Sequence, residues 1–341
     1  MNTITKQDEV QLIAVQKAEE NNYNCYLLLA TGSGKSKIAI DIHRRFRDKK
    51  VLLLVPTEPL RDVNWAKEYR KWKEIKLYNQ LERMCYASAY KLENQHYDLV
   101  IADEVDVLAS PEFSKFWRNN HTKHFIGLTA HVPGKAWELL PRYPVAFRYT
   151  LQEAVKDEVI SPYTVEVINV QMSSKEREEY NKQSSAIEYF RSTGRETKML
   201  NFKRARFLYQ LPSKVSIARA KLVEMLNEDR RVFVNAESTD MVDLITSEGY
   251  HSNNPEADEV LKKFLKKKSV VIGSAKKLNR GMNLGPLQGL LLVSYTQSIV
   301  AAIQKIGRTV RFEDGKLTRV IFLVTLETVE VNWFNKIKHS I

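Results

Sequence analysis

The sequence predicts an α/β protein of two units in tandem, each built on a parallel β-sheet. Residues 1–150 alternate short apolar runs with helix-like stretches, and a similar alternation returns after residue 228. Continuous apolar runs of this kind are typical of strands buried on both faces, as in parallel sheets. Residues 173–228 are instead highly charged and almost free of strand signal. We therefore expect a first domain over residues 1–150 and a second over 151–341, with a helical segment at 173–228.

In the first unit, the apolar runs predict four strands, at residues 26–29, 51–55, 97–102 and 125–128. Between the first two, Ile38, Ile42 and Phe46 recur every four residues, which is the spacing of an apolar helix stripe. Strand, helix and strand in this rhythm indicate a parallel α/β sheet.

In the second unit, residues 151–163 resemble a connector, and an extended run follows from Val165 to Val170. Further apolar runs predict strands at residues 232–234, 269–272, 290–293 and 320–324. A domain typically has roughly 100–200 residues. The chain length of 341 residues is therefore consistent with two domains.

Composition points to a polyanionic partner and away from membranes. The chain has 53 Lys and Arg residues against 41 Asp and Glu, a formal charge of +12, and nucleic acid is the commonest polyanion. No apolar run reaches the roughly 18 residues of a membrane span, and no signal peptide is evident at the N-terminus. Cys25 and Cys85 lack metal-ligand spacing, so we expect buried thiols in a reducing cytoplasm.

The segment YLLLATGSGKS at residues 26–36 has the order strand, glycine loop, helix. Gly32 and Gly34 would let the backbone approach a polyphosphate, while Lys35 reaches the β- and γ-phosphates and Ser36 ligates Mg²⁺. Thr31 and Ser33 complete this predicted ATP site. A strict phosphate loop would also have glycine at position 29, where this chain has leucine. A chance glycine-rich turn is the alternative, but the loop lies between a buried strand and an amphipathic helix.

The segment YDLVIADEVDVL places Asp103 and Glu104 directly after a predicted strand. Ligands of α/β sheets bind outside the carboxyl ends of strands. We therefore assign Asp103 to the Mg²⁺ ion and Glu104 to the attacking water. A solvated acidic loop is the alternative, and the phosphate loop earlier in the chain favours the functional interpretation.

A later cluster comprises Gln304, Arg308 and Arg311, spaced by four and by three residues. All three would share one helix face if the helix continued through Arg311. Arginines on one domain that face a nucleotide on another can stabilise charge on the transferring phosphate. A basic surface helix that contacts solvent or nucleic-acid phosphates is the alternative on spacing alone.

The helical segment interleaves basic and aromatic side chains between residues 173 and 215. Such a mixture suits single-stranded or forked nucleic acid, through phosphate contacts and base stacking. A helical hairpin with an aromatic core and a solvated basic face is the alternative, and we favour it slightly for the aromatic residues. His251 is interpreted as structural or strand-contacting rather than catalytic.

Taken in order, these segments resemble the motifs of superfamily 2 helicases and translocases over nearly the whole chain. The matching stretches are LATGSGKS, VLLLVPTEPL, DEVD, GLTAH, RVFVNAES, GSAKKLNRGMNL and QKIGRTVR. The resemblance implies two RecA-like domains, ATP and Mg²⁺ as cofactors, and nucleic acid as partner. It makes Gln11 an adenine-reading residue, Gly281 and Asn283 nucleotide-coupling residues, and Arg308 and Arg311 arginine fingers. It also assigns Thr57, Arg61 and Arg280 to contacts with the nucleic acid.

The details favour DNA as the substrate. Gln304 stands where DEAD-box RNA helicases carry histidine, and residues 151–163 are similar to the inter-domain connector of phage UvsW-type and restriction-enzyme helicases. We expect an ATP-dependent DNA helicase or translocase that is monomeric and works in a bacterial or phage-infected cytoplasm. A recruiting protein partner is a further expectation. An RNA motor with the same core and an ATPase that remodels protein complexes without unwinding remain alternatives.

Overall fold

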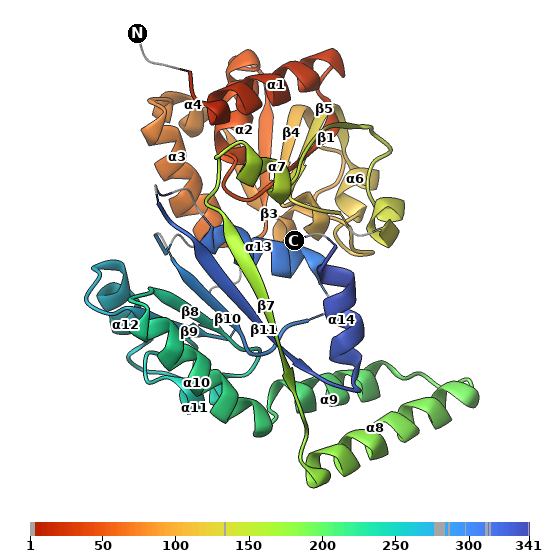
Figure 1. The fold of residues 1–341 in the computed structure, drawn as a ribbon. Helices are drawn as coiled ribbons and strands as arrows, with labels where there is room; N and C mark the ends of the chain where they lie inside the picture. Colours follow the sequence, from red (N-terminus) through yellow and green to blue (C-terminus); the bar gives the residue numbers. More distant parts are fainter. Residues whose placement is uncertain are drawn as a thin grey trace. The chain divides into compact units, whose positions relative to one another are not determined.

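The structure is a computed structural model, and it describes all residues except 1–3, 133, 276–283, 286, 297, 311–312, 314 and 340. The side chains of residues 135, 299, 300, 303, 304 and 308 are also outside the description. The chain divides into an N-terminal unit, Met1–Ile160, and a C-terminal unit, Ser161–Ile341 (Figure 1). Each unit has its own parallel sheet flanked by helices, which confirms the predicted α/β fold with two parallel sheets.

The described part of the N-terminal unit forms a sheet of six strands. They are β1 (Asn24–Leu29), β2 (Val51–Val55), β3 (Glu82–Cys85), β4 (His96–Asp103), β5 (His121–Thr129) and β6 (Val145–Tyr149). Its helices are α1 (Lys6–Glu20), α2 (Lys35–Arg45), α3 (Trp65–Lys71), α4 (Ile75–Gln80), α5 (Tyr86–Ala89), α6 (Lys115–Asn119) and α7 (Leu151–Lys156). Three short turns complete it, the π-helical η1 (Leu60–Asn64) and the 3₁₀ turns η2 (Val105–Val107) and η3 (Gly134–Leu139).

All strand pairs of this sheet are parallel, in the order β3-β2-β4-β5-β1-β6. The four predicted strands are the four central ones. The sequence analysis missed the two edge strands, β3 and β6. Their side chains are largely half-buried or exposed, so neither strand forms a continuous apolar run.

Side chains on the two faces of this sheet alternate along each strand. One face packs against residues of α5 and α6, and its side chains include Tyr26, Leu28, Leu52, Leu54, Val100 and Ala102. The stripe predicted for α2 is buried as expected, at Ile38, Ile42 and Phe46. Helix α1 packs against α2 and against β1 and β6. The phosphate loop therefore begins from a strand that is fixed on both faces.

Among the described residues, the C-terminal unit has a sheet of five strands, β7 (Tyr163–Val170), β8 (Val232–Asn235), β9 (Val271–Ser274), β10 (Gly289–Leu292) and β11 (Thr318–Thr325). Its helices are α8 (Ser174–Ser192), α9 (Lys198–Tyr209), α10 (Ser213–Asn227), α11 (Thr239–Ile245), α12 (Ala257–Leu265), α13 (Ile299–Thr309) and α14 (Val329–Ile337). The strand order is β7-β11-β10-β8-β9, again with parallel pairs only. The predicted helical segment corresponds to α8, α9 and α10.

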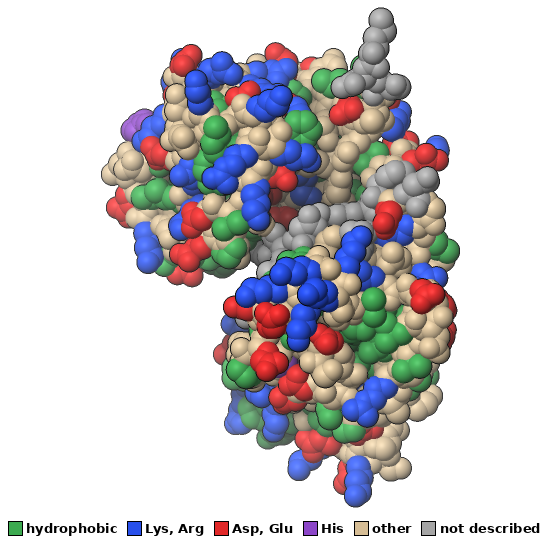
Figure 2. Space-filling model, turned by 90° about the vertical axis from the view of Figure 1, so that its left-hand side faces the viewer, with side chains coloured by type: hydrophobic (Ala, Val, Ile, Leu, Met, Phe, Trp, Pro, Cys, Tyr) green, Lys and Arg blue, Asp and Glu red, His purple; other side chains and the backbone are tan. Residues whose placement is uncertain are grey.

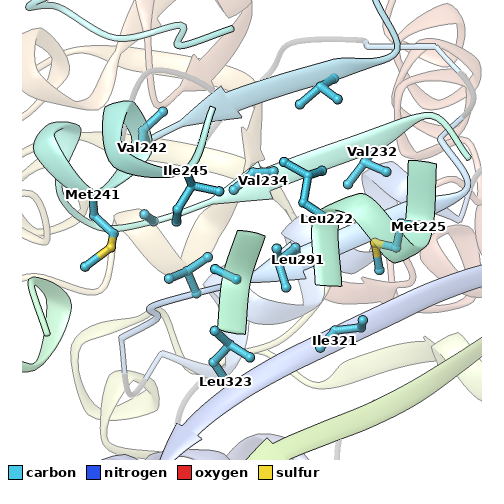
Figure 3. Packing of buried hydrophobic residues seen from close by; sticks show 14 of the residues in the cluster. Leu222, Met225, Val232, Val234, Met241, Val242, Ile245, Leu291, Ile321 and Leu323 are labelled. Carbon is cyan, nitrogen blue, oxygen red and sulfur yellow. The ribbon is translucent and has the colours of Figure 1, made fainter. Parts of the chain in front are cut away.

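One face of this sheet is covered by α10 and α11. The strands contribute apolar side chains to this face, among them Val234, Leu291 and Leu323 (Figure 3). The helices cover them with Leu222 and Met225 of α10 and with Met241, Val242 and Ile245 of α11. This apolar layer holds the β8–α11 connection in place.

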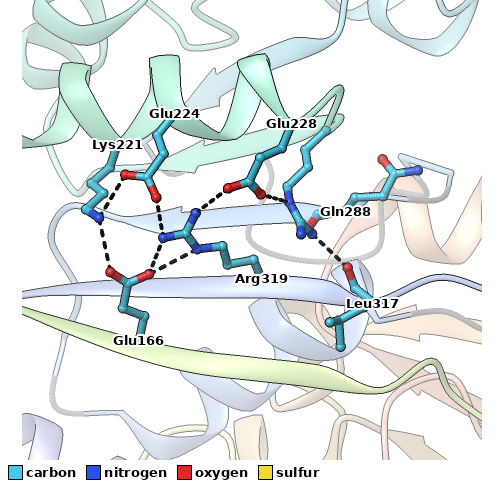
Figure 4. A network of polar contacts seen from close by, with 8 residues as sticks. Glu166, Lys221, Glu224, Glu228, Gln288, Leu317 and Arg319 are labelled. Carbon is cyan, nitrogen blue, oxygen red and sulfur yellow. Dashed lines mark hydrogen bonds and ion pairs between the residues drawn. The ribbon is translucent and has the colours of Figure 1, made fainter.

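A polar network fastens the edge strand β7 to α10 and β11 (Figure 4). Arg319 of β11 contacts Glu166 at 2.5 Å, Glu224 at 2.6 Å and Glu228 at 2.9 Å. Lys221 joins Glu166 and Glu224 from the other side, at 3.1 and 2.9 Å. These charges bridge three elements, so β7 is held although it has a neighbouring strand on one side only.

Helices α8 and α9 run side by side and extend from the sheet of the C-terminal unit (Figure 1). Tyr180 is buried with Leu208 and Leu211, as expected for an aromatic core. Tyr189 and Phe202 are not part of that core, because 59% and 60% of their surface is exposed. The aromatic core that the sequence analysis slightly favours therefore does not include these two residues.

On the face that Figure 2 presents, Lys and Arg side chains are interspersed with Asp and Glu. The net charge of +12 is therefore not gathered into one single-sign surface there. Both cysteines are buried free thiols, as predicted, and burial raises the pKa of Cys25 to about 12. Within the described part of the chain, no helix has the length and apolar character needed to cross a membrane.

Candidate nucleotide-binding site

The glycine loop connects β1 to α2 and has the backbone geometry that a phosphate loop requires. Gly32 and Gly34 have φ values of 97° and 91°, in the left-handed region that side chains disfavour. A Cβ atom at Gly34 would collide with the side-chain amide of Gln11. Gly34 caps α2, and the first N–H groups of this helix have no partner within it. The loop therefore presents free amides and the positive end of the helix dipole to an anion.

Two glutamines of α1 hold the outer side of this loop. Gln7 donates from Nε2 to the carbonyl of Gly32 at 2.9 Å, and Gln11 donates to the carbonyl of Ser33 at 3.1 Å. The Ser33 hydroxyl donates to the carbonyl of Ala30 at 2.8 Å. Because these carbonyls are bound on the α1 side, the loop is preorganised. Gln11, predicted to read adenine, is thus placed against the loop, and Ser33 supports its turn.

Lys35 and Thr31 supply groups that would suit a polyphosphate. Lys35 Nζ lies 3.2 Å from the carbonyl of Leu29, so the ammonium group folds back over the loop. The Thr31 hydroxyl is buried and has no hydrogen-bond partner within the described residues. A buried polar group without a partner is costly, and a bound phosphate oxygen would supply one. The lysine, this hydroxyl and the glycine cradle therefore fit a nucleoside triphosphate.

The acidic pair stands at the carboxyl end of the same sheet. Asp103 is the last residue of β4, and it pairs with Leu128 of β5. Thr129, the next residue of β5, pairs with Leu28 of β1, just before the phosphate loop. The register of three adjacent strands thus brings Lys35, Asp103 and Glu104 to one sheet edge, as predicted.

Asp103 is a buried carboxyl with two aromatic partners. Trp65 donates from Nε1 to Oδ2 of Asp103 at 3.1 Å, and the Tyr86 hydroxyl donates to the Asp103 carbonyl at 2.8 Å. Burial, and then the charge of Glu104, raise the pKa of Asp103, whereas Lys35 and the Trp65 N–H lower it. A divalent cation would favour the ionised form of such a carboxyl.

Glu104 is held in an unusual backbone conformation. Its φ of 50° and ψ of 57° lie in the left-handed region, which costs a non-glycine residue about 1–2 kcal/mol. Thr129 Oγ1 lies 3.5 Å from the Glu104 carboxylate and 2.9 Å from that of Asp106. Strain of this kind clusters at functional sites. Thr129 therefore links the acidic pair to the GLTAH segment.

The remaining predicted residues are not all placed. Thr57 precedes η1, and Arg61 lies within it, with its guanidinium bound to Asp62 at 2.7 and 2.8 Å. The Arg61 charge is therefore largely satisfied by its neighbour. Arg280, Gly281, Asn283 and Arg311 fall outside the described residues, as do the side chains of Gln304 and Arg308.

Arg311 and the side chains of Gln304 and Arg308 lie outside the described residues, so the predicted shared helix face of these three residues stays a prediction. Helix α13 ends at Thr309. Lys316 Nζ donates to the carbonyl of Thr309 at 2.7 Å, and the Ser161 amide donates to the carbonyl of Val310 at 2.8 Å. These two donors take the last carbonyls of the helix, which ends it.

Sequence reasoning missed three residues of this site, Gln7, Trp65 and Tyr86. Gln7 stands four residues before Gln11 in one helix, and this spacing could have indicated a second loop contact. Nothing in the sequence pairs Trp65 or Tyr86 with Asp103, because these contacts depend on how α3 and α5 pack. The described residues contain no cluster of three or more His, Cys, Asp or Glu that could hold a metal ion by itself. Any cation here would have to be held largely through a nucleotide.

Comparisons with known proteins agree with this geometry. Residues 1–84 match the family described as type III restriction enzyme, res subunit. No curated protein matches the chain in sequence. Among solved structures, the Hef helicase domain of Pyrococcus furiosus is similar at a TM-score of 0.57 and 15% identity, over 98% of this chain and 100% of that one.

The chain therefore shares the fold of this helicase domain. A second similar structure is the ATP-dependent type ISP restriction-modification enzyme LlaBIII bound to DNA, with a TM-score of 0.64 and 13% identity. The match covers 97% of this chain but 29% of that enzyme. The chain thus corresponds to less than a third of LlaBIII.

Proposed function

We propose that this protein is an ATP-dependent DNA translocase or helicase. The observation that carries the proposal is the meeting of the glycine loop, Lys35, Asp103 and Glu104 at the carboxyl edge of one sheet. A glycine loop alone would support nucleotide binding only. A buried acid beside a strained second acid adds the groups that hydrolysis of a phosphoanhydride requires.

Each residue has a role that follows from its position. The free amides of the loop and Lys35 bind the phosphates, and Ser36 and Asp103 hold the cation. Mg²⁺, when bound there, would neutralise part of the negative charge of the phosphates. Glu104 orients the attacking water and accepts its proton. Arg308 and Arg311 are assigned to stabilise charge on the transferring phosphate, on the strength of the motif resemblance.

DNA is the proposed track. The net charge of +12 favours a polyanion, and Gln304 departs from the DEAD-box pattern of RNA helicases. One similar structure is that of an enzyme bound to DNA. Movement or strand separation would follow from coupling ATP turnover to the nucleic-acid contacts, for which Thr57, Arg61 and Arg280 are our candidates.

A panel of nucleic acids tests this proposal. ATP turnover is measured with single-stranded, duplex, forked and branched DNA and with the corresponding RNAs. We expect stimulation by DNA above that by RNA, and loss of activity in Lys35→Ala. In Glu104→Gln we expect turnover to fall about 10²–10⁴-fold with ATP binding retained. Preferential stimulation by RNA would make the protein an RNA motor, and turnover that no nucleic acid changes would contradict the proposal.

A further inference from the structure

The C-terminal unit contains a cavity of about 590 Å³ that the nucleotide site does not use. One wall is formed by Phe202, Arg206, Tyr209 and Gln210 of α9. The opposite wall comes from residues 237–240, after β8, and from residues 251–253. This volume falls within the roughly 300–1,000 Å³ of pockets that take small organic groups.

Helix α9 divides its side chains between two faces. Asn201, Arg204 and Leu208 lie three and four residues apart, and Arg204 donates to the Ser184 hydroxyl of α8 at 3.1 Å. The stripe Met199, Phe202, Arg206 and Tyr209 has the same spacing on another face. Three of these four line the cavity, and Met199 is 75% exposed. On this stripe Phe202 and Arg206 are exposed, whereas Tyr209 is half-buried beside Trp333. The exposed aromatic and cationic side chains of the stripe lead into the cavity.

The walls present hydrogen-bond donors and acceptors, which are held in place by one bond between the walls and one bond within the second wall. Gln210 Nε2 donates to the Ser238 hydroxyl at 3.1 Å, which joins α9 to the opposite wall. Asn253 Nδ2 lies 3.3 Å from the Thr239 hydroxyl. Amides and hydroxyls in fixed positions can recognise the edge of a planar polar group.

The charge of the lining disfavours a phosphate as occupant. Among the described lining residues, Glu237 and Asp240 are acidic and Arg206 is the single cation. Glu237 is paired with Lys305 at 2.8 Å, and both side chains are almost fully buried. An anion would therefore meet the Asp240 carboxylate without a surplus of positive charge. Aromatic side chains with neutral polar groups suit an uncharged, flat ligand better.

A buried ring nitrogen in the cavity lining lacks a partner. His251 is 2% exposed, and its Nε2 lies 2.8 Å from the Asp243 carboxylate. Its Nδ1 is buried and forms no hydrogen bond with any described residue. If Nε2 carries the proton toward Asp243, Nδ1 is left as an acceptor. A ligand with an N–H group would satisfy it.

We propose that this cavity holds one unstacked base of single-stranded DNA, with Phe202 as the stacking platform. The proposal rests on the proposed DNA-dependent function and adds to it a site for a base rather than for the backbone. Phe202 offers an exposed aromatic face, and every base can stack on one. Gln210, Asn253 and His251 offer polar groups to the base edge. Lys203 and Arg206 of α9, both exposed, lie where the flanking phosphates would run.

The test uses oligothymidylate that carries a single 2-aminopurine, whose fluorescence reports stacking, moved along the strand. In the wild-type protein we expect one position with altered fluorescence. An abasic residue at this position should weaken binding about five- to a hundredfold, the range for loss of one stacked base. Phe202→Ala should cause a similar loss and abolish the fluorescence change. In the Phe202→Ala protein, the abasic residue should weaken DNA binding little further, because the stacking partner is already absent.

Tyr189→Ala is the matched control, because Tyr189 is an equally exposed aromatic residue on α8 that does not line the cavity. It should bind DNA as the wild type does, and Phe202→Trp should retain the fluorescence signal. If the wild type binds DNA and Phe202→Ala changes neither affinity nor fluorescence, the base site is wrong and the proposed function stands. If the wild type binds no nucleic acid, both proposals fail.

Discussion

At the scale of single residues, the N–H of Trp65 is the feature of the site whose loss should be most informative. It donates to the carboxylate of Asp103 from the first residue of α3, directly after the segment that carries Arg61. Partners that orient a metal ligand contribute about 10- to 100-fold in metal affinity or activity. Trp65 is therefore a positioning residue that joins η1 to the proposed cation site.

Trp65→Phe should raise the Mg²⁺ concentration needed for half-maximal ATP turnover by about 10- to 100-fold, because the aromatic bulk remains but the N–H is lost. The measurement is ATP turnover over a range of Mg²⁺ concentrations. Trp72→Phe is the matched control, because Trp72 Nε1 is buried and forms no hydrogen bond with any residue that the structure describes. Equal Mg²⁺ dependence in the two variants would contradict the role of Trp65.

Gly34 is the residue of the loop with the least freedom to change. Gly34→Ala combines a left-handed φ with a Cβ that collides with Gln11. We expect ATP binding to weaken by at least tenfold, which corresponds to about 1.4 kcal/mol. Gly194→Ala has a similar φ of 70° and meets no atom within 4 Å, so it should lower stability by about 1–2 kcal/mol and leave ATP binding unchanged. Nucleotide titration and chemical denaturation of both variants separate the two effects. Normal ATP binding by Gly34→Ala would show that the loop tolerates the change.

His43 makes the stability of the N-terminal unit depend on pH. Its ring is 1% exposed and contacts the Tyr69 hydroxyl at 2.7 Å, and burial lowers its pKa from 6.5 to about 4. The unfolded chain therefore takes up a proton first as the pH falls. Stability from this residue is complete above pH 6.5 and is lost progressively toward pH 4.

Between about pH 7.5 and about pH 5, the free energy of unfolding should fall by about 2 kcal/mol because of His43. His43→Gln should lose this component of the pH dependence, because glutamine does not titrate. Denaturation followed by tryptophan fluorescence measures it well, since Trp65 packs 6.1 Å from Tyr69, ring centre to ring centre. An identical pH dependence of stability in wild type and variant would contradict this assignment.

At the scale of elements, a buried ion pair fixes α10 to α14. Lys214 Nζ lies 2.7 Å from the Glu330 carboxylate, and both side chains are fully buried. The second oxygen of Glu330 accepts the Thr325 amide at 3.0 Å, at the end of β11. Removal of one partner would leave a buried charge, which typically costs about 3–5 kcal/mol.

Lys214→Met should therefore destabilise the C-terminal unit by about 3–5 kcal/mol. The double variant that combines Lys214→Met with Glu330→Gln should be less destabilised than this single variant. Urea unfolding gives the free energies, and amide hydrogen exchange in α10 and α14 shows whether the loss is local. A single variant within about 0.5 kcal/mol of the wild type would mean that the pair contributes no more than a surface substitution.

The sequence could predict those elements whose pattern is local. The central strands are continuous apolar runs, and α2 has a regular stripe at Ile38, Ile42 and Phe46. Edge strands β3 and β6 lack such runs, and the end of α13 is set by Lys316 and Ser161, which are distant in sequence. The same holds for the site. Lys35 and Asp103 follow from loop and strand patterns, whereas the contacts of Trp65 and Tyr86 with Asp103 arise only from packing.

At the scale of the whole molecule, the chain has two α/β units, each with a parallel sheet, and the fold of a helicase domain. These features lead to one central claim. We propose that the chain is an ATP-driven DNA motor, with Lys35, Asp103 and Glu104 at the carboxyl edge of the first sheet as its hydrolytic groups. A motor that moves along its track reaches higher turnover on longer tracks, because it spends less time in dissociation and rebinding. A protein that merely switches on DNA contact has no such dependence.

The most direct measurement is therefore steady-state ATP turnover as a function of DNA length, with Glu104→Gln as the inactive reference. We predict that turnover rises with length and then reaches a plateau, while the Glu104→Gln protein binds the same DNA without turnover. ATP hydrolysis that DNA does not stimulate, or that DNA stimulates equally at every length, would contradict the account.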